Sequence, residues 1–302
     1  MKVFQRILIS PDEPRLRSGW RLLGFFLLMF LALFVVGSLF IGVSVLVDSS
    51  VGAPVLAFLR DDSLISLVAI TASVYLARRW YDRRSFASLG LVRNRAANLD
   101  LLVGIFIPAL MMGLIFLALR ALGWLHLDGF AWQVNPFVWW DLGYFFAVFV
   151  MVGWYEELLT RGYMLQNLAD GINLPVAVFA SSAFFGIAHL ANPNATWASV
   201  LGIFAAGYFL AYAYLRTRQL WLPIGLHIGW NFFEGPVFSF PVSGLDTVRL
   251  LETRVDGPVL ITGGAFGPEA GLIVLPAMAL GALLIYYYNR RTSHLRGDES
   301  QS

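Results

Sequence analysis

The chain contains no cysteine, few charged residues and no long basic segment. Without cysteine it can form no disulfide bond, no thiolate nucleophile and no cysteine-ligated metal site. Asp, Glu, Lys and Arg make up only 13% of the 302 residues, and the formal net charge is +2. Because these few charges form no basic block, the sequence argues against a nucleic-acid partner.

Instead, the chain contains long uncharged apolar runs. Hydrophobic residues make up 58% of it, and its mean hydropathy is +0.70. The run from Leu22 to Val47 has 26 residues without a charge, more than the roughly 20 that cross the hydrocarbon core as a helix. It is too long for a signal peptide, so we expect a retained span. The sequence predicts an all-α integral membrane protein, a polytopic bundle of about eight transmembrane helices at 20–47, 55–77, 100–122, 137–157, 174–191, 196–215, 219–239 and 270–288.

The distribution of Lys and Arg predicts the orientation of these spans. With eight spans, one side carries 17 of the 21 Lys and Arg residues and the other side carries four. We therefore expect both termini in the cytoplasm. The expected organisation is an N-terminal two-helix segment over 1–84, a helical bundle over 85–290 and a polar cytoplasmic tail over 291–302. In the longest outer connection, 248–255 is expected to pair with 259–261 as a short hairpin.

Two adjacent carboxylates and an arginine interrupt the apolar segment that ends at Tyr155. Ionisable side chains at membrane depth are costly and usually mark function. Because an α-helix turns about 100° per residue, Glu157 and Arg161 share a face and Glu156 points away from them. We expect Arg161 to keep Glu157 charged and to orient it, while Glu156 faces a cavity as a general base. The alternative is a snorkelling cluster at a helix end.

Two histidines lie inside further apolar segments. Phe185 and His189 share one helix face by their spacing, and so do His227 and Asn231. Two buried donors at helical spacing can hold a developing oxyanion in a dry site. The alternatives are a hydrogen-bonded structural histidine and a polar contact that joins two helices.

Other polar residues carry weaker expectations. His126 lies in an outer loop and is expected to be solvated. Glu234 follows His227 on the same helix face, where it could line the rim of the cavity or, in the interpretation that we favour, act as an interfacial anchor. Asn167 and Asp170 are expected on a short amphipathic helix that Gly171 ends.

Three motifs, Glu-Glu-x-x-x-Arg, Phe-x-x-x-His and His-x-x-x-Asn, follow one another on successive predicted spans. In this order they resemble the CPBP family of intramembrane proteases. That family includes the type II CAAX prenyl endopeptidases and bacterial bacteriocin self-immunity homologues. The segments 189–193 and 266–269 support the resemblance, which covers roughly 85–288. The residues that match the motifs are Glu156, Glu157, Arg161, Phe185, His189, His227 and Asn231.

The resemblance implies an endopeptidase with its catalytic cavity inside the bilayer. Glu156 and His189 would position and activate the attacking water, and His227 and Asn231 would stabilise the oxyanion. The pair formed by the second glutamate and the arginine would support the site. Hydrolysis would then be direct, without an acyl-enzyme. The implied partners are the lipid bilayer and a membrane peptide or a lipidated protein as substrate, and the sequence does not say whether that substrate is prenylated.

A metal and two other functions stay open. Glu156, His189 and His227 could hold zinc as three protein ligands, and the family has been labelled a metalloprotease on that ground. However, the chain has no His-Glu-x-x-His spacing, and Asn231 suits an oxyanion clamp better than a ligand shell, so we favour catalysis without metal or cofactor. A proton-coupled transporter or channel is one alternative, although we find no inverted repeat. A non-catalytic immunity scaffold is the other.

Overall fold

The structure is a computed structural model that describes residues 8–10, 15–47 and 61–297. Its contacts group the chain into two compact units. Unit 1 comprises Met1–Leu91 and Trp154–Ala177, and unit 2 comprises Val92–Gly153 and Val178–Ser302. The chain passes from one unit to the other in the loop after Leu91, near the end of helix α6 (Val138–Glu157) and near the start of helix α8 (Leu174–Ala188).

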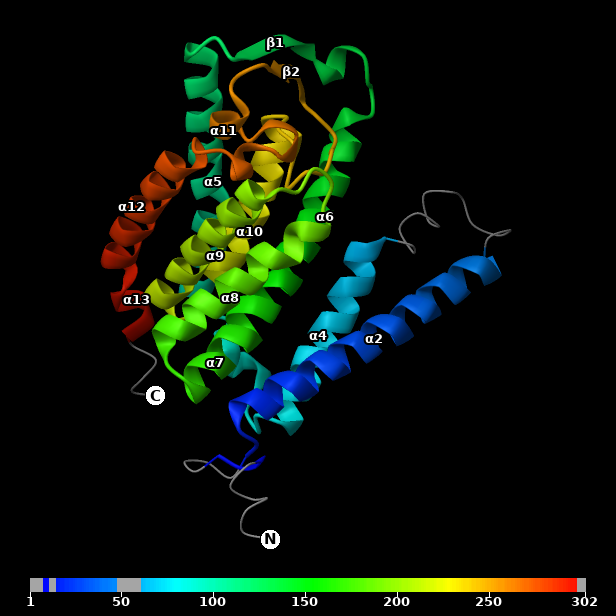
Figure 1. Cartoon of the computed structure of the whole chain (residues 1–302), viewed down its shortest axis with the longest axis vertical. Coiled ribbons are helices and arrows are strands. Elements are labelled where there is room, and N and C mark those ends of the chain that lie inside the picture. Colours follow the sequence, from blue (N-terminus) through cyan, green and yellow to red (C-terminus); the bar gives the residue numbers. More distant parts are fainter. Residues whose placement is uncertain (1–7, 11–14, 48–60, 298–302) are drawn as a thin grey trace. The chain divides into compact units, whose positions relative to one another are not determined.

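Unit 1 contains two long helices that lie side by side, and a shorter helical segment (Figure 1). Helix α4 begins where the Asp61 side chain accepts a hydrogen bond from the Ser63 amide (2.8 Å), an N-cap. The ring of Phe25 in α2 packs on Tyr163, with centroids 4.3 Å apart. The elements of unit 1 are α2 (Ser18–Val47), α4 (Asp62–Trp80), the 3-10 turn η1 (Phe86–Leu89), the π-helix η3 (Leu158–Met164) and α7 (Leu165–Gly171).

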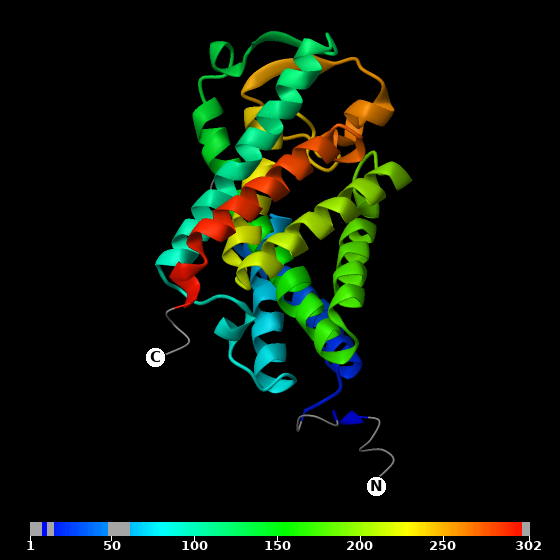
Figure 2. The same cartoon turned by 90° about the vertical axis from the view of Figure 1, so that its left-hand side faces the viewer.

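Unit 2 is a helical bundle with one two-stranded sheet. Helix α12 lies beside α5 and α9, as both views of the chain show (Figures 1 and 2). Its helices and strands are α5 (Arg95–Ala121), β1 (Leu125–Phe130), α6 (Val138–Glu157), α8 (Leu174–Ala188), α9 (Trp197–Thr217), α10 (Trp221–Phe232), β2 (Leu251–Val255), α11 (Val259–Thr262), α12 (Val274–Thr292) and α13 (His294–Gly297). The shorter 3-10 and π segments are η2 (Ala131–Gln133), η4 (His189–Ala191), η5 (Phe233–Val237), η6 (Gly264–Phe266) and η7 (Pro268–Ala270).

Helices α5 and α10 approach so closely that glycine is required at their contact. A Cβ on Gly225 would lie 2.3 Å from the Leu101 carbonyl oxygen, and one on Gly229 would lie 2.1 Å from that of Ile105. From the other side, a Cβ on Gly104 would lie 2.6 Å from the Leu222 carbonyl oxygen. Small residues let helix backbones come together in membrane proteins. This contact holds α10, which carries His227 and Asn231, against α5.

Five helical stretches of the described chain are long and apolar enough to cross a membrane. This confirms the predicted all-α membrane fold. One of them, over 174–191, has the predicted bounds, and α6, η3 and α7 form a single stretch to Gly171. Helices α4, α10 and α12 correspond to the other three predicted spans, so the count of eight stays a prediction. The five stretches are Ser18–Val47, Arg95–Ala121, Val138–Gly171, Leu174–Ala191 and Trp197–Thr217.

The predicted hairpin between 248–255 and 259–261 is wrong. Strand β2 pairs antiparallel with β1, which precedes it by more than a hundred residues. The segment after β2 forms helix α11 instead, in which the Thr262 amide donates to the Pro258 carbonyl (3.0 Å). Proline has no amide to donate to a strand partner and suits the start of a helix, and Gly263 ends the helix at φ +82°.

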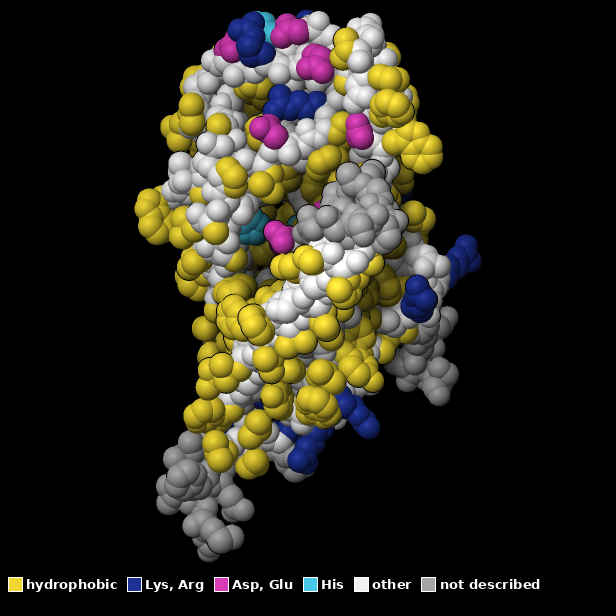
Figure 3. Space-filling view, turned by 90° about the vertical axis from the view of Figure 1, so that its right-hand side faces the viewer, with side chains coloured by type: hydrophobic (Ala, Val, Ile, Leu, Met, Phe, Trp, Pro, Cys, Tyr) yellow, Lys and Arg dark blue, Asp and Glu magenta, His cyan; other side chains and the backbone are white. Residues whose placement is uncertain are grey.

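Charged side chains gather at the upper end of the face shown in Figure 3, over strands β1 and β2. Asp256 pairs there with Arg254 (2.9 Å) and with His126 (3.3 Å). The His126 side chain is 40% exposed, which confirms its predicted solvation.

Candidate active site

The carboxylate motif lies in unit 1, at the point where the helix changes from α to π. Glu157 ends α6, and a π-helical turn follows, in which the Leu165 amide donates to the Thr160 carbonyl five residues earlier. Arg161 Nη1 donates to Glu157 Oε1 (2.7 Å) and to Thr160 Oγ1 (2.8 Å). The Glu157 side chain is 0% exposed and that of Arg161 is 1% exposed. The predicted Glu157–Arg161 pair is confirmed, although the helix between them is π rather than the expected α.

The preceding carboxylate has a different environment. Glu156 is partly exposed, whereas its neighbour Glu157 is completely buried. Its backbone carbonyl accepts a hydrogen bond from Thr160 Oγ1 (2.6 Å), so one threonine joins the backbone of Glu156 to the guanidinium of Arg161. Because buried π turns recur at functional sites, this winding is itself an indication of function. The two carboxylates therefore differ as expected, one paired and dry and the other more accessible.

The two histidines lie in unit 2, and both contact the same aromatic ring. The ring of Phe185 is 4.9 Å from that of His189 and 5.9 Å from that of His227, between centroids. His189 Nδ1 lies 2.8 Å from the Phe185 carbonyl oxygen. A carbonyl oxygen can only accept, so Nδ1 carries the proton and a neutral His189 presents the lone pair of Nε2. The structure thus brings both histidines together and fixes the tautomer of one of them.

His227 and Asn231 are one turn apart on α10. They are 6% and 8% exposed, so both are buried. Their common helix face is the one that the spacing predicts. Two donor-capable side chains are therefore held in a dry part of unit 2.

Two further carboxylates of unit 2 are buried close to these residues. Glu269 accepts hydrogen bonds from Trp230 Nε1 (3.0 Å), the Ser243 amide (2.8 Å) and Ser243 Oγ (2.6 Å). Burial raises the pKa of Glu269, which lies in the turn before α12, while the Ser243 hydroxyl and the nearby His189 act in the opposite direction. Glu234 is 0% exposed, so its interpretation as an interfacial anchor is wrong.

The sequence contained one signal for Glu269 and none for the burial of Glu234. Glu269 falls in the segment 266–269 that supports the family resemblance. Glu234 lies at the end of an apolar segment, where an interfacial anchor and a buried carboxylate have the same sequence pattern. In the structure Glu234 lies in the π turn η5, where Gly235 and Pro236 are buried as well.

The structure therefore assembles the predicted site residues as two groups. The carboxylates and the arginine belong to unit 1, and the histidines and the asparagine belong to unit 2. Among the residues that the structure describes, no three His, Asp or Glu side chains are grouped as a metal site requires. No catalytic step is assigned to a metal, and catalysis without one stays a prediction.

An all-α integral membrane protein with carboxylate, imidazole and amide side chains buried in its apolar helices is the class that this fold and these residues define. Residues 138–233 match the family model described as Type II CAAX prenyl endopeptidase Rce1-like. This range contains all three motifs. Over this range the chain is similar to CAAX-type membrane peptidases.

A curated relative is similar over part of the chain. A Bacillus subtilis protein named "Putative membrane peptidase YdiL" is 32% identical over 112 residues, which are 37% of this chain and 41% of that relative. The chain therefore matches less than half of the length of this relative. No solved structure matches the chain.

Proposed function

We propose that the chain is an intramembrane endopeptidase that hydrolyses a peptide bond of a membrane peptide or a lipidated protein. The observation that carries the proposal is the arrangement around Phe185, whose ring contacts both His189 and His227. Support comes from the family match, because its range includes both histidines and both adjacent carboxylates.

In this proposal, Glu156 takes a proton from a water molecule while His189 orients that water through Nε2. The oxygen of the water bonds to the carbonyl carbon of the substrate. The carbonyl oxygen becomes an oxyanion, which His227 and Asn231 stabilise as hydrogen-bond donors. The proton on Glu156 then passes to the leaving nitrogen, and the carbon–nitrogen bond breaks. Water is thereby divided between the new carboxylate and the new amine, with no covalent enzyme intermediate.

The pair of Glu157 and Arg161 has a supporting role in this mechanism. Its members are buried and bonded to each other, so they hold the turn that follows Glu156 rather than reach a substrate. Thr160 extends this support, because its hydroxyl binds the Glu156 backbone and accepts from Arg161. Loss of the pair is expected to lower activity through misplacement of the general base.

The proposal is tested with the full chain in proteoliposomes and a library of quenched peptides, each with a farnesylated or an unmodified cysteine. Mass spectrometry of peptides from membranes that contain or lack the enzyme extends the search for substrates. Glu156→Gln and His189→Gln are expected to lower cleavage by at least about 100-fold, since a general base contributes 10²–10⁴-fold. Glu252→Gln, at an exposed position of β2, is the matched control. Wild-type cleavage rates in both site variants would refute the assignment.

A further inference from the structure

Unit 1 contains a cavity at the N-terminal end of α2, apart from the carboxylate motif. The cavity has a volume of about 610 Å³. Its lining includes the first turn of α2 and the last residues of α7. The lining residues that matter here are Arg15, Arg17, Ser18, Gly19, Arg21 and Asp170.

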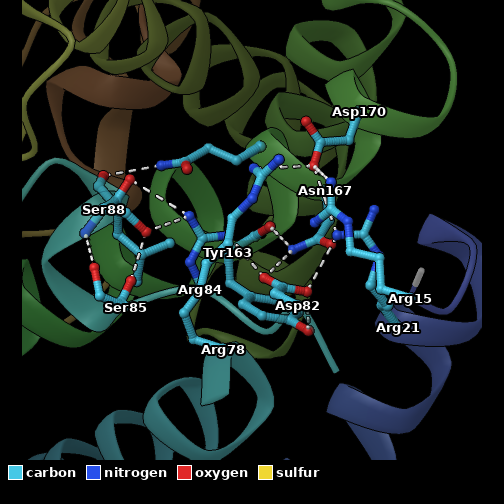
Figure 4. Close-up of polar contacts among 12 residues, drawn as sticks. Arg15, Arg21, Arg78, Asp82, Arg84, Ser85, Ser88, Tyr163, Asn167 and Asp170 are labelled. Atoms are coloured by element: carbon cyan, nitrogen blue, oxygen red, sulfur yellow. Dashed lines mark hydrogen bonds and ion pairs between the residues drawn. The ribbon is translucent and has the colours of Figure 1, made fainter. Parts of the chain in front are cut away.

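The wall of this cavity is held by a buried network around Asp82 (Figure 4). Asp82 is 1% exposed and accepts from Arg21 Nη1 (3.2 Å) and Arg78 Nη1 (2.8 Å). Asn167 Nδ2 (3.3 Å) and the Tyr163 hydroxyl (3.4 Å) donate to the same carboxylate. Arg21 is therefore fixed in place before any ligand arrives.

The described lining is strongly basic. It includes three guanidinium groups, those of Arg15, Arg17 and Arg21, and one carboxylate, that of Asp170. Asp170 is itself shared, since it lies 3.0 Å from Arg15, 3.6 Å from Arg21 and 3.4 Å from Arg84. Arg21 is 2% exposed, and its Nε, a buried donor, has no hydrogen-bond partner among the described residues. A preorganised, cationic cavity of this kind suits an anion.

Two features indicate a phosphate group. The first turn of α2 faces the cavity, and helix N-termini bind phosphate through their amide groups and the helix dipole. Arginine guanidinium groups bind phosphate oxygens in pairs. Gly171 adds room, because a Cβ there would lie 1.6 Å from Ser18 Oγ. The close approach of α7 to the start of α2 thus depends on glycine.

The remaining lining indicates where the phosphate comes from. Trp20 and Leu23 also line the cavity and are 41% and 50% exposed. They begin the apolar helix α2, which is long enough to cross a bilayer, and tryptophan at such a helix end is typical of the membrane interface. The cavity is also larger than an inorganic phosphate ion requires. We propose that it binds the phosphate of an anionic lipid headgroup, with Arg17 and Arg21 as the phosphate ligands.

Arg17 is the position for the test because it is exposed and its substitution leaves the Asp82 network intact. Arg79→Gln removes the same charge from an exposed position of α4 in the same unit and is the matched control. The full chain is reconstituted in nanodiscs of phosphatidylcholine alone or with 20% phosphatidylglycerol, and bound lipid is counted by native mass spectrometry. Thermal unfolding in detergent is measured with added phosphatidylglycerol or added inorganic phosphate.

Wild type and Arg79→Gln are expected to retain phosphatidylglycerol over phosphatidylcholine and to gain thermal stability with it. Arg17→Gln is expected to bind it about tenfold more weakly, the loss of one charge-assisted contact. Equal retention of the two lipids, or equal binding by Arg17→Gln and Arg79→Gln, overturns the proposal. If inorganic phosphate stabilises the protein at the same concentration as phosphatidylglycerol does, the bound phosphate need not belong to a lipid, and the proposal of a lipid ligand is overturned.

Discussion

Replacement of Glu157 by glutamine tests the structural role of the buried pair. The substitution keeps the volume of the side chain and removes its charge, while Arg161 stays buried with Thr160 Oγ1 at 2.8 Å. Removal of one partner of a buried ion pair costs about 3–5 kcal/mol, because the other charge is left without compensation. One kcal/mol shifts the unfolding midpoint of a chain of 150–250 residues by about 2–4 °C, and of a longer chain by less. For this chain of 302 residues we therefore expect a fall of roughly 5–10 °C.

The assay is thermal unfolding of the purified chain in one detergent, followed by circular dichroism. Glu156→Gln is the internal comparison, because it alters the neighbouring, partly exposed carboxylate and is expected to change the midpoint by only about 2 °C or less. A double variant, Glu157→Gln with Arg161→Met, removes both charges and so measures the interaction between the two residues. Its loss is expected to be smaller than the sum of the two single losses, since the two sites interact. A Glu157→Gln midpoint within about 2 °C of wild type would refute the reasoning.

Three further predictions concern the rest of the chain. Asp82→Asn leaves Arg21 and Arg78 without their shared carboxylate and should cost about 3 kcal/mol or more in unfolding free energy, whereas Asp128→Asn, at an exposed position, should cost less than about 0.5 kcal/mol. Gly229→Ala places a Cβ against a backbone oxygen of α5 and should cost at least about 1–3 kcal/mol; Gly42→Ala, with open space around it, should be neutral or stabilising. Peptide cleavage should survive treatment with 1,10-phenanthroline; a loss that added zinc restores would contradict the metal-free mechanism.

Local patterns in the sequence were enough to predict the helices and the short-range pairs. The long apolar runs predict the membrane helices, because length and composition decide whether a helix can cross a bilayer. The spacing of Glu157 and Arg161 predicts their ion pair, and the spacing of Phe185 and His189 predicts their contact. In each case both partners lie on one helix or its end.

Contacts between distant segments could not be predicted in this way. Strand β2 pairs with β1 across more than a hundred residues, so the hairpin expected from the nearest apolar segment was wrong. Asp82 binds Arg21 and Asn167 from 61 and 85 residues away, and no local pattern marks it as buried. Glu234 shows the same limit, since its burial depends on how the segment after α10 folds back.

The π turn after Glu157 also determines how the following helix of unit 1, α7, is rotated about its axis. A π turn takes one residue more than an α turn, and one residue corresponds to about 100° of rotation. Helix α7 is thereby turned so that Asn167 reaches Asp82 and Asp170 meets three arginines. Deletion of a single residue within Leu158–Met164 would swing both side chains to another side of the helix. The π turn beside the proposed general base and the basic cavity at the start of α2 are thus geometrically coupled.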